Sequence, residues 1–150
     1  MKRRRVLLLI GGAIGLFGAQ PRGRAHAATL RRVGILHVAS DAEGATMRAP
    51  FKLGMQELGW HEGKNIEYRV LAAGGDPGRL EALARELVAQ GVDVIVAPTG
   101  STTRAAMRAT TTIPIVMTGV GDPVAEGFVA SLARPGGNMT GVNFFAAELA

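Results

Sequence analysis

The sequence predicts an α/β fold in which an open parallel sheet carries helices on both faces, giving three layers. Short β-rich segments alternate with segments of helical periodicity from residue 32 onward. The segment Val92–Ala97 is almost entirely apolar, which is typical of a central parallel strand that is buried on both faces. Strands joined by single helices need right-handed crossovers, and these crossovers produce the layered arrangement.

The composition is that of a packed domain. The chain has 150 residues, of which 47% are hydrophobic and 19% charged, and this balance argues against intrinsic disorder. The sequence contains no cysteine, which excludes a disulfide framework and a thiolate metal site. A chain of this length is expected to form one domain.

Most of the net positive charge belongs to the N-terminus. The formal net charge is +5, yet no acidic residue precedes Asp41, and the charges nearly cancel from Ala28 onward. A basic surface on the folded domain is therefore not predicted, and we expect no nucleic-acid partner.

The N-terminus has the pattern of an export signal. Met1–Arg5 is positively charged, Val6–Ala19 is apolar, and Ala25–Ala27 has the small-x-small form that signal peptidase requires. We expect residues 1–27 to be a signal peptide cleaved after Ala27, and residues 28–150 to form the α/β domain. The apolar run is too short to cross a hydrocarbon core of roughly 30 Å as a helix. A lipid anchor would need a cysteine, so we expect a free periplasmic protein, exported by the general secretory or the twin-arginine route.

The first predicted strand and helix come from the segment that follows the leader. Arg32–Val38 is a β-rich run that ends in the polar, small-residue stretch Ala39–Thr46. A helix is expected to begin near Pro50, because proline suits the first turn, and to end at Gly59. Its apolar positions are Phe51, Met55 and Leu58.

The second unit consists of a strand at Asn65–Leu71, nearer the sheet edge, and a loop at Ala72–Gly75. Asp76 and Pro77 predict a helix start, because aspartate accepts the free backbone N–H groups and proline has none to lose. The apolar stripe of this helix is Leu80, Leu83, Leu87 and Val88.

Two further units complete the predicted sheet. After the strand Val92–Ala97 and the loop Pro98–Thr102, we expect a helix at Thr103–Thr110 and a strand at Ile115–Thr118. Asp122 repeats the helix-start pattern, and that helix is expected to carry Val124, Phe128 and Leu132 on one face before a strand at Thr140–Phe144.

Ligands of such sheets bind outside the carboxyl ends of the strands. Four loops meet this description: Ala39–Asp41, Ala72–Gly75, Pro98–Thr102 and Gly119–Asp122. The candidate ligand-binding residues taken from these loops are Ser40, Gly74, Thr99, Gly100, Ser101, Thr102, Gly121 and Asp122.

The loop Pro98–Thr102 carries the most chemical information. Its hydroxyls and backbone N–H groups precede a predicted helix, and a helix N-terminus favours an anion such as a carboxylate. The alternative is that Ser101 or Thr102 only caps the helix, and spacing leaves both interpretations open. Asp76 and Asp122 are most simply N-caps.

No pattern in the sequence predicts catalysis or a metal site. His37 and His61 lack metal-ligand spacing, and no G-x-S-x-G elbow is present. Gly119–Val124 begins like a dinucleotide fingerprint but has valine where the third glycine or alanine is needed. We therefore expect no catalytic residue, metal or cofactor.

The assembled motifs resemble a known family from about Arg32 to the end of the chain. The sequence is similar to the ABC transporter substrate-binding proteins of the TrpX-like group in these segments: Leu58-Gly59-Trp60, Glu62-Gly63-Lys64-Asn65-Ile66, Val92-Asp93-Val94-Ile95-Val96, Thr112–Met117, Gly121–Val124 and, most specifically, Ser131–Gly141.

The resemblance implies a periplasmic receptor of two α/β lobes with the type I periplasmic-binding fold. A small solute would lie between the lobes, and the closed form would be presented to an ABC permease in the inner membrane. Several relatives are associated with aromatic amino acids, so the implied ligand is an amino acid or a related carboxylate. The resemblance also implies that the chain stops after its first, N-terminal lobe.

Two other classes of protein remain open on the residues alone. The first is an α/β enzyme or nucleotide-binding domain that uses the same sheet edge. The second is a flavodoxin-like interaction domain. Saturable binding of a free amino acid without turnover would separate the receptor from both.

Overall fold

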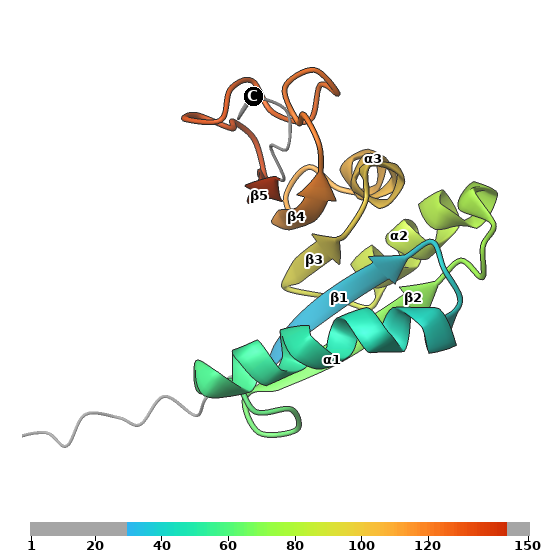
Figure 1. Cartoon of the computed structure of the whole chain (residues 1–150), viewed down its shortest axis with the longest axis vertical. Helices are drawn as coiled ribbons and strands as arrows, with labels where there is room; N and C mark the ends of the chain where they lie inside the picture. The colour runs from blue at the N-terminus through green and yellow to red at the C-terminus, as the bar shows by residue number, and fades with distance from the viewer. Residues whose placement is uncertain (1–29, 144–150) are drawn as a thin grey trace, which may run out of the picture.

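The computed structural model describes residues 30–143, which form a five-stranded sheet with helices on both faces (Figure 1). The elements are β1 (Arg31–His37), α1 (Asp41–Glu57), β2 (Ile66–Ala72), the 3-10 turn η1 (Pro77–Arg79), α2 (Leu80–Ala89), β3 (Val94–Ala97), α3 (Gly100–Ala109), β4 (Ile115–Val120) and β5 (Met139–Asn143). The strand order is β2-β1-β3-β4-β5, and all neighbours are parallel. The predicted α/β class is therefore confirmed, while the export signal and Phe144 lie outside the described residues.

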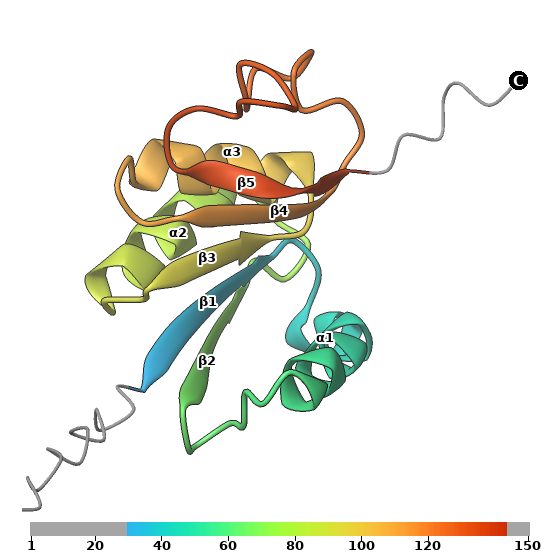
Figure 2. The same cartoon turned by 90° about the vertical axis from the view of Figure 1, so that its left-hand side faces the viewer.

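The two faces of the sheet pack against different helices (Figure 2). On one face, α2 and α3 enclose the larger core cluster, whose innermost members include Leu36, Ala84, Leu87, Ile95, Ala106 and Ile115. On the other face, Phe51 and Met55 of α1 pack against a smaller cluster of Val33, Ile35, Ile66 and Val96. Alternate residues of β1 and β3 enter opposite clusters because successive side chains of a strand point to opposite faces. The central position predicted for β3 and the edge position predicted for β2 are both confirmed.

Helix α1 begins nine residues earlier than Pro50, so the predicted start of this helix is wrong. The cause is a capping box at Ser40: its Oγ accepts from the Glu43 N–H at 3.3 Å, and Glu43 Oε2 accepts from the Ser40 N–H at 3.0 Å. Pro50 lies inside the helix, where it removes one N–H donor. The Ser-x-x-Glu spacing predicts such a start, and it outweighs the preference of proline for the first turn.

The helix expected after Asp122 does not form, and this prediction is also wrong. Asp122 caps a single turn, because its Oδ1 accepts from Val124 N–H at 3.0 Å and from Ala125 N–H at 2.9 Å. Gly127 then takes a φ of 73°, which ends the turn. Phe128 is instead drawn into the core cluster beside α3. The connection from β4 to β5 is therefore irregular.

The close packing of α2 on β1 depends on Gly34. A Cβ at this position would lie 3.1 Å from Leu87 Cδ1 and 3.3 Å from Val92 Cγ1. Glycine thus lets the helix approach the sheet within ordinary contact distance of the backbone.

Gly34→Val should destabilise the domain by about 1–3 kcal/mol, because the added methyl groups enter space that Leu87 already fills. The measurement is the free energy of unfolding in urea. Gly54→Ala is the matched control, since nothing lies within 4 Å of its added Cβ and alanine favours the helix interior. Equal stabilities of the parent and the Gly34 variant would contradict this account of the packing.

Candidate ligand-binding site

The four predicted loops lie at the same edge of the sheet, where the parallel strands end. The loops after β1 and β2 are joined directly, because the Gly75 N–H donates to the Val38 carbonyl at 2.7 Å. The ends of β3 and β4 are also in close contact, since a Cβ added at Gly119 of β4 would lie 2.3 Å from the carbonyl oxygen of Pro98, which follows β3. Only glycine fits at that position without a backbone shift.

The loop after β3 forms the N-terminus of α3, with Thr99 as the N-cap. Thr99 Oγ1 accepts from the Thr102 N–H at 3.3 Å, and Thr102 Oγ1 accepts from the Thr99 N–H at 2.9 Å. This reciprocal pair is a capping box in which threonine replaces the usual glutamate. The capping residue is therefore Thr99 rather than Ser101 or Thr102, and the helix begins three residues earlier than expected.

The hydroxyls of this loop separate into two roles. Thr102 is fully buried, and its hydroxyl also donates to the Thr99 carbonyl at 2.9 Å. Ser101 is exposed, and its Oγ lies 3.0 Å from Thr99 Oγ1. The geometry assigns Thr102 to the helix cap, and it leaves the side chains of Thr99 and Ser101 exposed at the surface. That any of these residues contacts a ligand stays a prediction.

A carboxylate of the same chain lies beside this helix N-terminus. A Cβ at Gly100 would lie 2.7 Å from Glu126 Oε2, and the same oxygen lies 3.6 Å from Arg104 Nη2. Glu126 comes from the irregular connection that follows β4. The acidic group thus occupies the region where the helix dipole favours negative charge.

The remaining candidates are placed at the same edge by local hydrogen bonds. Ser40 is engaged in the cap of α1, where its Oγ lies 2.6 Å from Glu43 Oε2. Gly74 has a φ of 68° and is exposed, and Gly121 is exposed beside the capping residue Asp122. The hydrogen bonds confirm the capping role of Asp122 and of Asp76, whose Oδ1 accepts from the Gly78 N–H at 2.9 Å. The structure brings these residues to one edge, and their contact with a ligand stays a prediction.

Sequence reasoning missed a polar cluster beneath the first turn of α1. His37 is only 6% exposed at the end of β1, and its Nε2 has no hydrogen-bond partner. Arg48 Nη2 lies 2.8 Å from Asp41 Oδ1, while its buried Nη1 also lacks a partner. Burial is the main cause that lowers the pKa of His37, the Arg48 charge lowers it further, and Asp41 raises it. His37 follows an apolar run, so only the three-dimensional packing reveals that it is enclosed.

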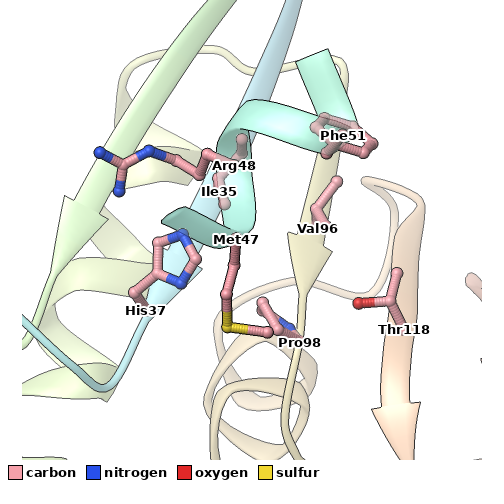
Figure 3. A pocket seen from close by; sticks show the side chains of 8 residues that line it. All are labelled: Ile35, His37, Met47, Arg48, Phe51, Val96, Pro98 and Thr118. Carbon is pink, nitrogen blue, oxygen red and sulfur yellow. The ribbon is translucent and has the colours of Figure 1, made fainter. Parts of the chain in front are cut away.

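A cavity of about 220 Å³ adjoins this cluster (Figure 3). It lies between α1 and the sheet, at the carboxyl ends of the neighbouring strands β1 and β3. The chain continues from β1 into α1 on one face of the sheet and from β3 into α3 on the other face. The lining residues of the cavity are Ile35, His37, Met47, Arg48, Phe51, Val96, Pro98 and Thr118. Such a change of direction in the strand order is where open α/β sheets bind ligands.

Within residues 30–143, no helix is long and apolar enough to cross a membrane. The same residues hold no group of three or more histidine, cysteine, aspartate or glutamate side chains that could bind a metal ion.

The fold is an α/β domain of the doubly wound type, and its candidate ligand site lies at the carboxyl edge of the sheet. Residues 32–149 match the family described as ABC transporter substrate binding protein. The chain belongs to this family, as the resemblance in its motifs indicated.

Individual relatives agree with this family. The "Tyrosine-binding protein" of Clostridioides difficile (strain R20291) is 32% identical over 113 residues, which are 75% of this chain and 33% of the relative. A solved ABC domain from Streptococcus pneumonia in complex with L-Trp is 25% identical, with a TM-score of 0.70, over 77% of this chain and 39% of that chain. The ligand-free, open structure of a substrate binding protein with adhesive properties from Clostridium difficile is 29% identical, with a TM-score of 0.72, over 79% of this chain and 40% of that chain. The chain thus spans about a third of the length of the curated relative.

The buried state of His37 predicts a pH dependence of stability. Its pKa is lowered in the folded protein from a value of about 6.5 in the unfolded chain, so the unfolded chain binds the proton more readily. The free energy of unfolding should therefore fall as the pH decreases below about 6.5, until the lowered pKa is passed.

The measurement is urea unfolding at several pH values between 7 and 5, an interval that spans the ordinary histidine pKa of about 6.5. His37→Gln should reduce the loss of stability over this interval. His61→Gln removes an exposed imidazole and serves as the control that should retain the loss. An unchanged pH slope in the His37 variant would show that this imidazole does not cause it.

Proposed function

We propose that this chain is the N-terminal ligand-binding lobe of a solute receptor for an ABC importer, and that it binds its solute without converting it chemically. The observation that carries the proposal is the loop after β3: its Pro98 lines a cavity at the change of strand direction, and the next residue, Thr99, begins the hydroxyl-bearing N-terminus of α3. Membership of the substrate-binding protein family supports the same role. A permease in the inner membrane is the partner that this role requires.

The ligand that we propose is an amino acid with an aromatic side chain. One relative is named as tyrosine-binding, and a related structure holds L-Trp. The backbone N–H groups and hydroxyls at the start of α3 suit the carboxylate of such a ligand, which would take the place that the Glu126 carboxylate holds beside Gly100 in this structure. Ser40, Gly74, Thr99, Gly100, Ser101, Gly121 and Asp122 are the proposed residues of this edge, with Thr102 acting through the cap.

A single lobe buries only part of a small ligand. The affinity of this chain alone should therefore be weak, because ligand sites of this class gain their strength from enclosing most of the ligand surface. Binding is best measured with millimolar ligand by the chemical shifts of the backbone amides.

Export accompanies this function in our proposal. The basic and apolar leader supports cleavage after Ala27 and release into the periplasm. Expression in a Gram-negative host should yield a periplasmic product whose N-terminal sequence starts at Ala28. A product that keeps Met1 and stays in the cytoplasm would contradict this part of the proposal.

Ser101→Ala tests the role of the hydroxyl-rich loop. Titration with L-tyrosine or L-tryptophan should show an affinity that is about 3- to 10-fold lower than that of the parent, the loss expected for one hydrogen bond. The melting temperature should be unchanged, because Ser101 is exposed and Thr99 supplies the cap.

Thr111→Ala is the matched control, since it removes an exposed hydroxyl beyond the opposite end of α3. It should leave the affinity unchanged. If neither aromatic amino acid produces a saturable response in the parent chain, the proposed function is wrong. If both variants bind like the parent, the loop has no part in it.

A further inference from the structure

The cavity beneath α1 is mostly apolar. Met47 and Phe51 of α1 form one wall, and Ile35, Val96 and Pro98 form the floor along β1 and β3 (Figure 3). Met47 is 67% exposed, so one side of the cavity is open to entry from solvent. An apolar cavity of 150 Å³ already accommodates a benzene ring in other proteins. The volume of about 220 Å³ is thus sufficient for one aromatic side chain.

The position of the cavity connects it to the proposed carboxylate site. Pro98 lines the cavity, and the next residue, Thr99, is the N-cap of α3. An amino acid whose carboxylate lies at the N-terminus of α3, against Thr99, therefore has its side chain near Pro98 and the cavity. Ser101, two residues further on, also lines the hollow between α3 and the start of α2.

Three polar side chains line the cavity, His37, Arg48 and Thr118, and the third of them suits a ring that carries a hydrogen-bonding group. The Thr118 hydroxyl points toward the cavity (Figure 3) and takes part in none of the side-chain hydrogen bonds found in residues 30–143. A threonine hydroxyl can accept from an indole N–H and can pair with a phenol O–H. A phenyl ring or an aliphatic chain would leave this hydroxyl unused.

The thioether of Met47 adds a second preference for an aromatic ring. A methionine sulfur gains a favourable contact at the edge of a ring, and its flexible side chain adapts to the shape of the ligand. Met47 lies on the first half of α1, and its exposure places it where an entering ring would meet it first.

We propose that this cavity is the subsite for the aromatic side chain of the ligand, and that the Thr118 hydroxyl distinguishes tryptophan and tyrosine from phenylalanine. The inference rests on the proposed function, because it assigns a side-chain subsite to that receptor. Met47 and Phe51 enclose the ring, and Pro98 separates it from the carboxylate.

Labelled methionine methyl groups provide the test. The chain carries its own control, since Met107 is 42% exposed on α3 and lines a different surface hollow. With ¹³C-methyl methionine, titration with L-tryptophan or L-tyrosine should shift the Met47 resonance saturably and leave Met107 unmoved. L-leucine at the same concentrations should produce a smaller shift, because it has no ring current.

Thr118→Val tests the polar contact without changing the shape of the side chain. It should weaken the binding of L-tyrosine and L-tryptophan about 3- to 10-fold and leave that of L-phenylalanine unchanged. Thr111→Val is the control for the loss of a threonine hydroxyl elsewhere and should bind all three like the parent.

The results separate this inference from the proposed function. Shifts of the Thr99 and Ser101 amides with an unmoved Met47 would overturn the ring subsite and leave the receptor role intact. Equal losses for all three aromatic ligands in the Thr118 variant would overturn the assignment of the hydroxyl. A chain in which no resonance responds to any amino acid would contradict both proposals.

Discussion

β1 and β3 pair in parallel through Val33–Ile35 and Val94–Val96, and their chains then depart to opposite faces of the sheet. From β1 the chain enters α1 on one face, and from β3 it enters α3 on the other. This divergence opens a crevice at the carboxyl edge between the two loops, and parallel pairing holds its sides at a fixed spacing. The hydroxyl-rich start of α3, the cavity beneath α1 and the buried His37 are all located by this one pairing.

The sequence predicted the sheet well because the strands carry a strong and unambiguous signal. Val92–Ala97 is apolar at every position except Asp93, and such a run is typical of a strand enclosed on both faces. Helix starts were harder, because competing local preferences meet there. Pro50 favoured a late start for α1, but the capping box of Ser40 and Glu43 outweighed this preference. Pro50 therefore lies inside the helix, where one backbone N–H donor is missing. After Asp122, Gly127 and the burial of Phe128 ended a helix that periodicity alone had favoured.

The candidate site was only partly predictable. Loops at the ends of parallel strands can be located from the strand order, so the edge and its residues followed from the sequence. The division of roles within Thr99–Thr102 could not be foreseen, because spacing does not show which hydroxyl is turned inward. His37, Met47 and Thr118 carry no local signal at all. They converge only when α1 packs beside β1, β3 and β4, and a contact between distant segments leaves no trace in either segment alone.

The close approach of Gly119 to the Pro98 carbonyl has a consequence for how this edge of the sheet can change in evolution. Because two stretches of main chain meet there with no room for a Cβ, the spacing between the ends of β3 and β4 is set by backbone atoms rather than by side chains. Substitutions at Met47, Phe51 or Thr118 can therefore change the lining of the cavity while the ends of β3 and β4 keep their spacing. The lining of the cavity and the frame of this edge depend on separate residues, so one can change in evolution without the other.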